Sequence, residues 1–157
     1  MRSDANRSGL GGVVTMVACS TMIAVCPGHT EGQGRVDAGT ERQVQKVFRD
    51  YASCERSRDF KRCFTLLSSR LREDWARQHN VTTERTYQSV KGGEEIQFAT
   101  HRILKIERTG DRVTVTARTT GDGERGRFDV ERHYLFVLQA GRWKIDGITE
   151  GSYEYLP

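Results

Sequence analysis

The sequence lacks the short motifs that mark the common enzyme classes. It has no Walker or dinucleotide-binding fingerprint, no G-x-S-x-G nucleophile motif and no H-E-x-x-H zinc motif. Its four histidines show no metal-ligand spacing, and two cysteines without clustered histidines are too few for a structural zinc site. We therefore expect neither a metal nor a cofactor, and we favour a binding role over catalysis.

The chain also lacks a stretch in which charge of one sign dominates. The formal net charge is +4, but basic and acidic residues alternate throughout, as in REDWAR and GDGERGRFDVER. Nucleic-acid-binding proteins usually concentrate their positive charge in one stripe and carry a recognisable motif. We therefore expect no nucleic-acid partner. A length of 157 residues, 36% of them hydrophobic, is typical of a single folded domain.

No apolar run is long enough for a spanning helix, which needs roughly 20 residues. The longest segment, residues 10–25, follows Arg2 and Arg7 and contains several glycines and threonines. A basic start, a short apolar centre and a small polar continuation are typical of a secretory signal. We expect residues 1–26 to be an export signal, so that membrane contact occurs only through this N-terminal segment.

The cleavage site has more than one interpretation. Cys26 ends an IAVC stretch that resembles the lipid-attachment box of bacterial lipoproteins, although Val25 stands where a small residue is usual. Cys19 is the alternative lipidation site, and ordinary export with incidental cysteines is a third interpretation. Residues 27–39 are glycine-rich and predict a flexible tether, so the folded domain is expected at residues 40–157, periplasmic or attached to the cell envelope.

Apolar residues recur at helical spacing through the first half of this domain. Residues 40–43 fit a capping box, and the first helix then has its apolar face at Val44, Val47, Phe48, Tyr51 and Ala52. Residues 54–59 interrupt the pattern, which resumes at Phe60, Cys63, Phe64, Leu67, Leu71 and Trp75. This predicts either two packed helices or one broken helix and a following one. A further short helix is expected over residues 83–90.

Cys54 and Cys63 lie on either side of this interruption. On one continuous helix they would be separated by about 13 Å along the axis and could not bond. Across a bend they could reach the roughly 4.4–6.8 Å between Cα atoms that a disulfide allows. Because export favours oxidation, we expect the disulfide, with two buried free thiols as the alternative.

The hydrophobic period changes to two after Gly93. One face of a first strand carries Ile96, Phe98, Thr100, Arg102, Leu104 and Ile106, and one face of a second carries Val113, Val115, Ala117 and Thr119. Residues 128–148 then predict a hairpin, with an apolar run at 134–138 and a turn at 139–141. Helices followed by consecutive antiparallel strands predict an α+β fold, with N-terminal helices packed on a curved sheet of four or more strands.

The closing stretch YLFVLQAGRWKIDGI, after a helix pair and a meander, resembles the nuclear transport factor 2-like superfamily, a cone-like, cystatin-like α+β fold. The resemblance covers about residues 40–148 and implies a pocket between the helices and the curved sheet. It implies little about function, because the superfamily spans isomerases, dehydratases, transport factors and exported proteins.

Enzymes of this superfamily use a pocket Asp or His as a general base, and no residue here matches that motif. Asp146 comes closest by position, but its alternation with Trp143 and Ile145 predicts an outward, exposed side chain. His101 and His133 occupy the polar parity of their strands.

Two arginines have the inward parity of their strands, Arg102 and Arg132. Together they could bind a carboxylate or phosphate. A bulge that reverses the parity, or a guanidinium that reaches the rim, is the alternative unless an acid such as Glu94 or Asp129 lies nearby. The candidate ligand-binding residues are Arg102, Arg132, Trp75, Tyr87, Phe98 and Tyr134.

These observations favour an exported, envelope-tethered domain without catalytic activity. It would bind a small apolar or anionic ligand or a protein partner, including a second copy through the sheet face. The alternatives are a small pocket enzyme of the isomerase or dehydratase kind, and a structural accessory subunit of an envelope assembly.

Overall fold

A computed structural model describes residues 34–92 and 97–156 of the chain. The expected export signal, with Cys19 and Cys26, and most of the expected tether lie outside the described residues. In the described ranges, no helix is both long enough and apolar enough to cross a membrane.

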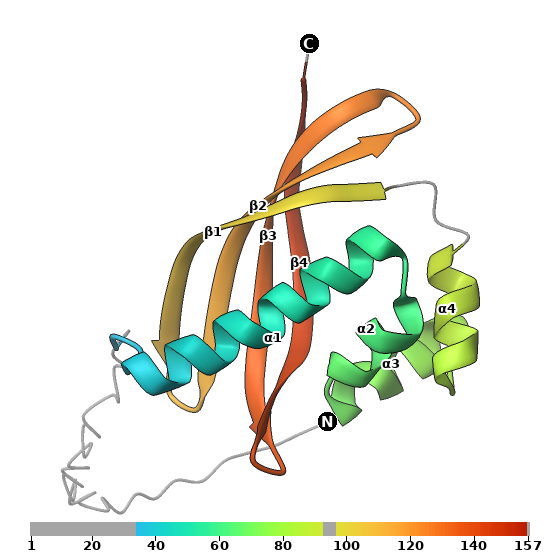
Figure 1. Cartoon of the computed structure of the whole chain (residues 1–157). Helices are drawn as coiled ribbons and strands as arrows, with labels where there is room; N and C mark the ends of the chain where they lie inside the picture. The colour runs from blue at the N-terminus through green and yellow to red at the C-terminus, as the bar shows by residue number, and fades with distance from the viewer. Residues whose placement is uncertain (1–33, 93–96, 157) are drawn as a thin grey trace, which may run out of the picture. The chain divides into compact units, whose positions relative to one another are not determined.

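In the described residues, helices form the first half of the fold (Figure 1). They are α1 (Ala38–Ser57), α2 (Phe60–Leu66), α3 (Ser69–His79) and α4 (Glu84–Gly92). The helix that was expected to begin at a Thr40 capping box begins earlier, because the Asp37 carboxylate accepts hydrogen bonds from the amides of Gly39 and Thr40 at 3.0 and 2.9 Å. The folded part also starts before residue 40, since Val36 is buried and Gly34 pairs with Arg108.

Four antiparallel strands follow in the order β1-β2-β3-β4, and each pairs with the next along the chain. They are β1 (Gln97–Thr109), β2 (Arg112–Gly123), β3 (Gly126–Gln139) and β4 (Arg142–Tyr155). Ala140 and Gly141 connect β3 to β4 with φ angles of 49° and 73°. This is the hairpin that the sequence predicted. The left-handed backbone at Gly141 is accessible to glycine without steric cost.

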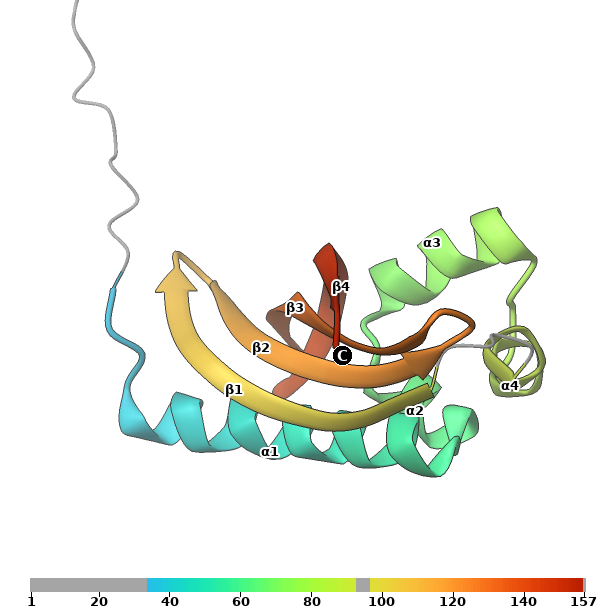
Figure 2. The same ribbon diagram turned by 90° about the horizontal axis from the view of Figure 1, so that it is seen from above.

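The strands form a curved sheet, and α1 crosses one of its faces (Figures 1 and 2). The core between them contains Val44, Phe48 and Tyr51 from α1 and the alternating inward residues of β2 and β3. The predicted parity of β2 is confirmed, with Val113, Val115, Ala117 and Thr119 all buried. The α+β class and the helices-on-sheet arrangement are confirmed as well.

Strand β1 departs from the predicted alternation. Its pairing with β2 shifts between Phe98 and Thr100 and again between Ile103 and Lys105. Each bulge reverses the parity, so His101 turns to the core and Arg102 to solvent. The inward side chain predicted for Arg102 is therefore wrong, and the structure shows the alternative, a bulge that reverses the parity. The solvent-facing parity predicted for His101 is also wrong.

A similar irregularity changes the position of Asp146. The pairing of β3 with β4 shifts between Leu135 and Phe136, and consecutive residues Ile145 and Asp146 are both buried as a result. The prediction of an exposed Asp146 is wrong. Its carboxylate instead accepts hydrogen bonds from Ser68 Oγ at 2.5 Å and from Arg70 Nε at 2.9 and 3.0 Å.

Candidate functional site

A cleft of about 150 Å³ lies where the helices meet β3 and β4. It is lined by Tyr51, Leu67, Leu71, Trp75, Tyr87, Lys91, Arg132, Ile148 and Glu150. Apolar and aromatic side chains supply most of this lining, and Lys91, Arg132 and Glu150 supply the charges. A concave, mostly apolar pocket with a few polar groups is the usual form of a small-molecule site.

The aromatic walls are Tyr51 from α1, Trp75 from α3 and Tyr87 from α4. The Trp75 and Tyr87 rings meet edge to face with centroids 5.2 Å apart, and Phe64 supports Tyr87 from behind at 5.3 Å. The Lys91 ammonium lies 4.9 Å from the centre of the Trp75 ring. These contacts orient the indole and phenol rings before any ligand arrives.

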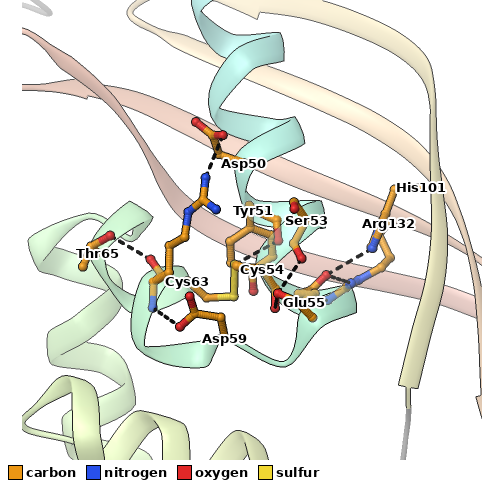
Figure 3. The surroundings of a disulfide bond; sticks show 12 residues. Asp50, Tyr51, Ser53, Cys54, Glu55, Asp59, Cys63, Thr65, His101 and Arg132 are labelled. Carbon is orange, nitrogen blue, oxygen red and sulfur yellow. Dashed lines mark hydrogen bonds and ion pairs between the residues drawn. A yellow bond between two sulfur atoms is a disulfide. The ribbon is translucent and has the colours of Figure 1, made fainter.

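Arg132 is the central charged group of the site, and it is only 3% exposed. Its Nη1 donates to Glu55 Oε2 at 2.9 Å, and its Nη2 donates to Glu55 Oε1 at 3.4 Å (Figure 3). The plane of the guanidinium faces the Phe98 ring, with its carbon 4.1 Å from the ring centre. Arg132 is thus held by a fork of hydrogen bonds and by an aromatic face.

The Nε of Arg132 points toward a second carboxylate. It lies 3.0 Å from Glu150 Oε1, close enough for an ion pair, but its N–H is not aligned for a hydrogen bond with any described residue. Arg132 and Glu150 both line the cleft, but the Nε atom itself is buried, and the more exposed group of the pair is Glu150.

Burial and these charges shift the pKa values of the cluster. Burial raises the pKa of Glu55, while Arg132 opposes that rise. Burial alone would lower the pKa of Arg132, but the nearby Glu55 raises it, so the guanidinium stays charged. Burial, assisted by Arg132, lowers the pKa of His101 to about 4.

His101 is consequently neutral at pH 7. Its Nε2 is 3.6 Å from Glu55 Oε2, and its Nδ1 is 3.2 Å from Thr119 Oγ1. A neutral imidazole adds no positive charge beside Glu55. Arg132 therefore provides most of the positive charge that balances the Glu55 carboxylate.

The Cys54–Cys63 disulfide lies directly beside this cluster (Figure 3). The two Cα atoms are 5.6 Å apart, inside the expected window. α1 continues to Ser57, so the bond spans the turn between α1 and α2. The disulfide fixes the end of α1 next to Glu55, which accepts the hydrogen bonds of Arg132.

The structure brings together some of the predicted ligand-binding residues and separates others. Trp75, Tyr87 and Arg132 line the cleft. Tyr134 is fully buried, with its ring centre 5.2 Å from the Arg132 guanidinium carbon, and Phe98 is half-buried against the same guanidinium. Arg102 is exposed and pairs across the strands with Arg118.

The acid partners of Arg132 in the described residues are not the two acids that the sequence suggested, Glu94 and Asp129. Asp129 accepts a hydrogen bond from Thr120 Oγ1 at 2.6 Å, and Glu94 lies outside the described residues. The observed partners are Glu55 and Glu150. Glu55 had a signal in the sequence, because it follows Tyr51 by four residues and Phe48 by seven on the buried face of α1.

The described part of the chain contains no group of three or more His, Cys, Asp or Glu side chains that could hold a metal ion. The arrangement offers a small cleft with aromatic walls, with Lys91, Arg132 and Glu150 as the charged residues of its lining.

Solved structures with the same fold share little sequence with this chain. An NTF2-like protein of unknown function from Pseudomonas putida KT2440 has a TM-score of 0.55 and 10% identity, over 76% of this chain and 89% of its own. A cystatin-like protein of unknown function from Nostoc punctiforme PCC 73102 has a TM-score of 0.53 and 7% identity, over 74% and 93%. An NTF2-like protein of unknown function from Shewanella baltica OS155 has a TM-score of 0.51 and 12% identity, over 77% of this chain and 98% of its own.

The chain therefore has the nuclear transport factor 2-like, or cystatin-like, fold, as the sequence resemblance implied. At these identities the likeness concerns the fold alone. No family model and no curated protein matches the sequence.

Proposed function

We propose that this chain is a non-catalytic binding domain, exported and tethered at the cell envelope, which takes a small and mostly apolar molecule into its cleft. The cleft itself carries the proposal. Its walls are preordered aromatic and aliphatic side chains, and its volume of about 150 Å³ matches a cavity that accommodates a benzene-sized molecule.

The charges favour an uncharged ligand over an anionic one. Arg132 already faces two carboxylates, Glu55 and Glu150. A ligand carboxylate would have to displace Glu150 and would lie near buried Glu55, and both effects oppose binding. Glu150, whose side chain is 32% exposed, is instead an acceptor for a neutral hydroxyl group.

The arrangement of ionisable groups supports binding rather than catalysis. A proton-transfer enzyme needs a group of tuned pKa within reach of its substrate. Glu55 and His101, whose pKa values are shifted, do not line the cleft, and Tyr51, which does, has a pKa raised by burial away from neutral pH. Both oxygens of Glu55 also accept from Arg132, so neither is available to take a proton from a ligand.

The test uses the intrinsic fluorescence of Trp75. Trp143→Phe leaves Trp75 as the single tryptophan, since the chain has two. We expect cyclohexanone and toluene to change its emission with saturation, and benzoate to bind more weakly. Emission that changes only linearly with every probe would refute the cleft as a ligand site.

Two matched variants show where the probe binds. Leu71 lines the cleft, and Leu71→Phe should fill it and weaken binding about tenfold or more. Leu104 is 43% exposed on β1, and Leu104→Phe should leave binding unchanged. Equal effects of the two substitutions would contradict binding in the cleft.

Export and tethering require a separate experiment on the full chain in a bacterial host. Cell fractionation with intact-mass analysis should find an envelope-bound protein whose N-terminus is processed and lipidated at Cys26. Cys26→Ser should release it from the envelope, whereas release by Cys19→Ser would move the site to Cys19. Recovery from the cytosol with Met1 intact would refute export. Native mass spectrometry of the same sample also reports a retained ligand and tests the predicted homodimer through the sheet face.

A further inference from the structure

A second, open groove lies between the start of α3 and the β3–β4 turn, and it shares no residue with the cleft. Its volume is about 490 Å³, and it is lined by Ser69, Arg72, Gln139, Ala140, Arg142 and Lys144. Three of these six residues are cationic and none is acidic. An uncompensated group of three cations in one concavity is unusual in a chain whose charges otherwise alternate.

Two of the cations are held in place by backbone carbonyl groups at the end of α2. Lys144 Nζ donates to the Thr65 carbonyl oxygen at 2.6 Å. Arg72 donates from Nε and Nη2 to the Leu67 carbonyl oxygen at 3.1 and 3.0 Å. Cations often bind the last carbonyl groups of a helix in this way, and such capping alone accounts for these two residues.

Capping does not account for Arg142. Its exposed side chain makes no hydrogen bond or ion pair with any described residue, yet it lines the same groove. Burial, with the nearby charges of Arg72 and Arg142, lowers the pKa of Lys144. Arg72 and Arg142 therefore both repel Lys144, and an anion bound in the groove would reduce that repulsion.

Donors remain available after the capping bonds are counted. Lys144 uses one of its three N–H groups, and Arg72 uses its Nε and one Nη2 group. The start of α3 contributes less, because the Ser69 amide already donates to Gln139 Oε1 at 3.1 Å. The recognition elements are thus the side chains of the cations and not the helix end.

The adjoining surface extends the same positive region. A neighbouring hollow shares Arg142 and Lys144, and its one carboxylate, Asp50, is already paired with Lys46 at 2.9 Å and Arg62 at 3.0 Å. Asp50 is therefore not a free countercharge for the groove.

We propose that this groove is a phosphate-binding site, in which Arg142, Lys144 and Arg72 together bind one phosphate group. A phosphate group has up to two charges and several acceptor oxygens, which suit three convergent cations better than a carboxylate does. The group could belong to a free phosphate compound or to the headgroup of an anionic lipid. This proposal concerns a different surface from the cleft and does not depend on what the cleft binds.

The first arm of the test is a titration of the full chain with inorganic phosphate, followed by amide NMR. We expect saturable shifts at Ser69, Gly141 and Arg142. Arg142→Glu should weaken binding about tenfold or more. Arg127→Glu is the matched control, because Arg127 is also exposed, lies at the start of β3, away from the β3–β4 turn, and its substitution produces the same change in net charge. It should change the affinity by less than about twofold.

The second arm uses vesicles of phosphatidylcholine with and without phosphatidylglycerol, in a co-sedimentation assay with the same variants. Binding that depends on phosphatidylglycerol and is lost in Arg142→Glu but kept in Arg127→Glu would identify a lipid headgroup. A response only in the phosphate arm would identify a free phosphate compound.

Two results would overturn the site. Equal weakening by Arg142→Glu and Arg127→Glu would mean that only the overall charge matters. Absence of saturable phosphate shifts together with absence of vesicle binding that depends on Arg142 would mean that the groove binds no phosphate group. Arg142 has no side-chain partner among the described residues, so we expect its variant to fold, and Lys144→Gln gives a second, independent substitution.

Discussion

Two arginine–carboxylate pairs connect the helices to the sheet, and they differ in how much of each pair is removed from water. In the first, the side chains of Arg132 and Glu55 are 3% and 4% exposed. In the second, Asp146 is 6% exposed, but its partner Arg70 is 55% exposed. Both pairs join residues far apart in the sequence, so both help to fix how the helices sit on the sheet.

The two pairs differ in what can take the place of the arginine when it is removed. Water can reach the place of Arg70, and Ser68 Oγ would still donate to Asp146. Water has no comparable access to the place of Arg132, and His101 beside Glu55 is neutral at pH 7. A buried charge without a partner is among the costliest defects in a folded protein, whereas an exposed ion pair contributes little. The Glu55 pair should therefore be the more sensitive of the two.

The largest effect is expected from breaking the buried pair. Arg132→Leu leaves Glu55 buried without a countercharge and should lower the free energy of unfolding by about 3–5 kcal/mol. Urea denaturation at pH 7 measures this loss. Arg102→Leu is the matched control, because Arg102 is exposed on the neighbouring part of the sheet and forms no ion pair with a described residue. It should change stability by less than about 0.5 kcal/mol. Similar losses in both variants would contradict the buried pair's special role.

The next effect depends on pH and on His101. Its folded pKa, about 4, lies below the ordinary value of 6.5, so the folded state resists protonation. The stability from the neutral imidazole is complete above about pH 6.5 and is lost as the pH falls toward 4, by up to about 3 kcal/mol. His101→Phe should lack this loss.

Urea denaturation of both proteins between pH 7 and pH 4.5 tests the prediction. Glu55, whose pKa is raised by burial, contributes in the opposite direction, since its stabilising effect is lost as pH rises. Glu55 is present in both proteins, so their difference reports His101. Parallel pH profiles would show that His101 does not titrate in this way.

A smaller effect is expected from the disulfide beside the buried pair. Cys54→Ala with Cys63→Ala removes a link over a sequence separation of 9 residues and should lower the free energy of unfolding by about 2.5 kcal/mol. Thermal denaturation under oxidising and reducing conditions measures the same quantity in the unaltered chain. If reduction leaves the melting temperature of the unaltered chain unchanged, the link contributes no stability.

The smallest of these effects is expected at the half-exposed pair. Arg70→Ala should cost about 1–2 kcal/mol, because Arg70 makes charged hydrogen bonds to Asp146 and Asp74 that water can partly replace. The comparison with Arg132→Leu, measured by the same urea denaturation, is the decisive result. A larger loss at Arg70 than at Arg132 would reverse the ranking and show that exposure is not what distinguishes the two pairs.

Part of the candidate site was predictable from the sequence. Trp75 and Tyr87 were assigned as possible pocket walls, and Arg132 as an inward cation, from apolar periodicity and strand parity. These residues do line the cleft. Glu55 is absent from the predicted site residues, because the sequence pattern predicts an interruption of the helix from Cys54 onward. α1 in fact continues to Ser57 and carries Glu55 on its buried face.

Register shifts in two strand pairs, β1 with β2 and β3 with β4, made the rest of the prediction wrong. Alternation assumes that each strand pairs without a bulge, and β1 has two shifts against β2. These turn Arg102 outward and His101 inward. The shift between β3 and β4 buries Asp146 in the same way. Bulges accompany the bending of a sheet, so they depend on how several strands pack together and leave a weak local signal.

What the sequence by itself determined is the local structure: the helical faces, the inward residues of β2 and β3, and the closing hairpin. These follow from backbone geometry, since side chains repeat every 3.6 residues on a helix and every two on a strand. Only the tertiary structure decided which acids meet Arg132, which face Arg102 takes and where a cleft remains. Those outcomes depend on contacts between residues such as Glu55 and Arg132, which are 77 positions apart and meet only once the sheet has curved against the helices.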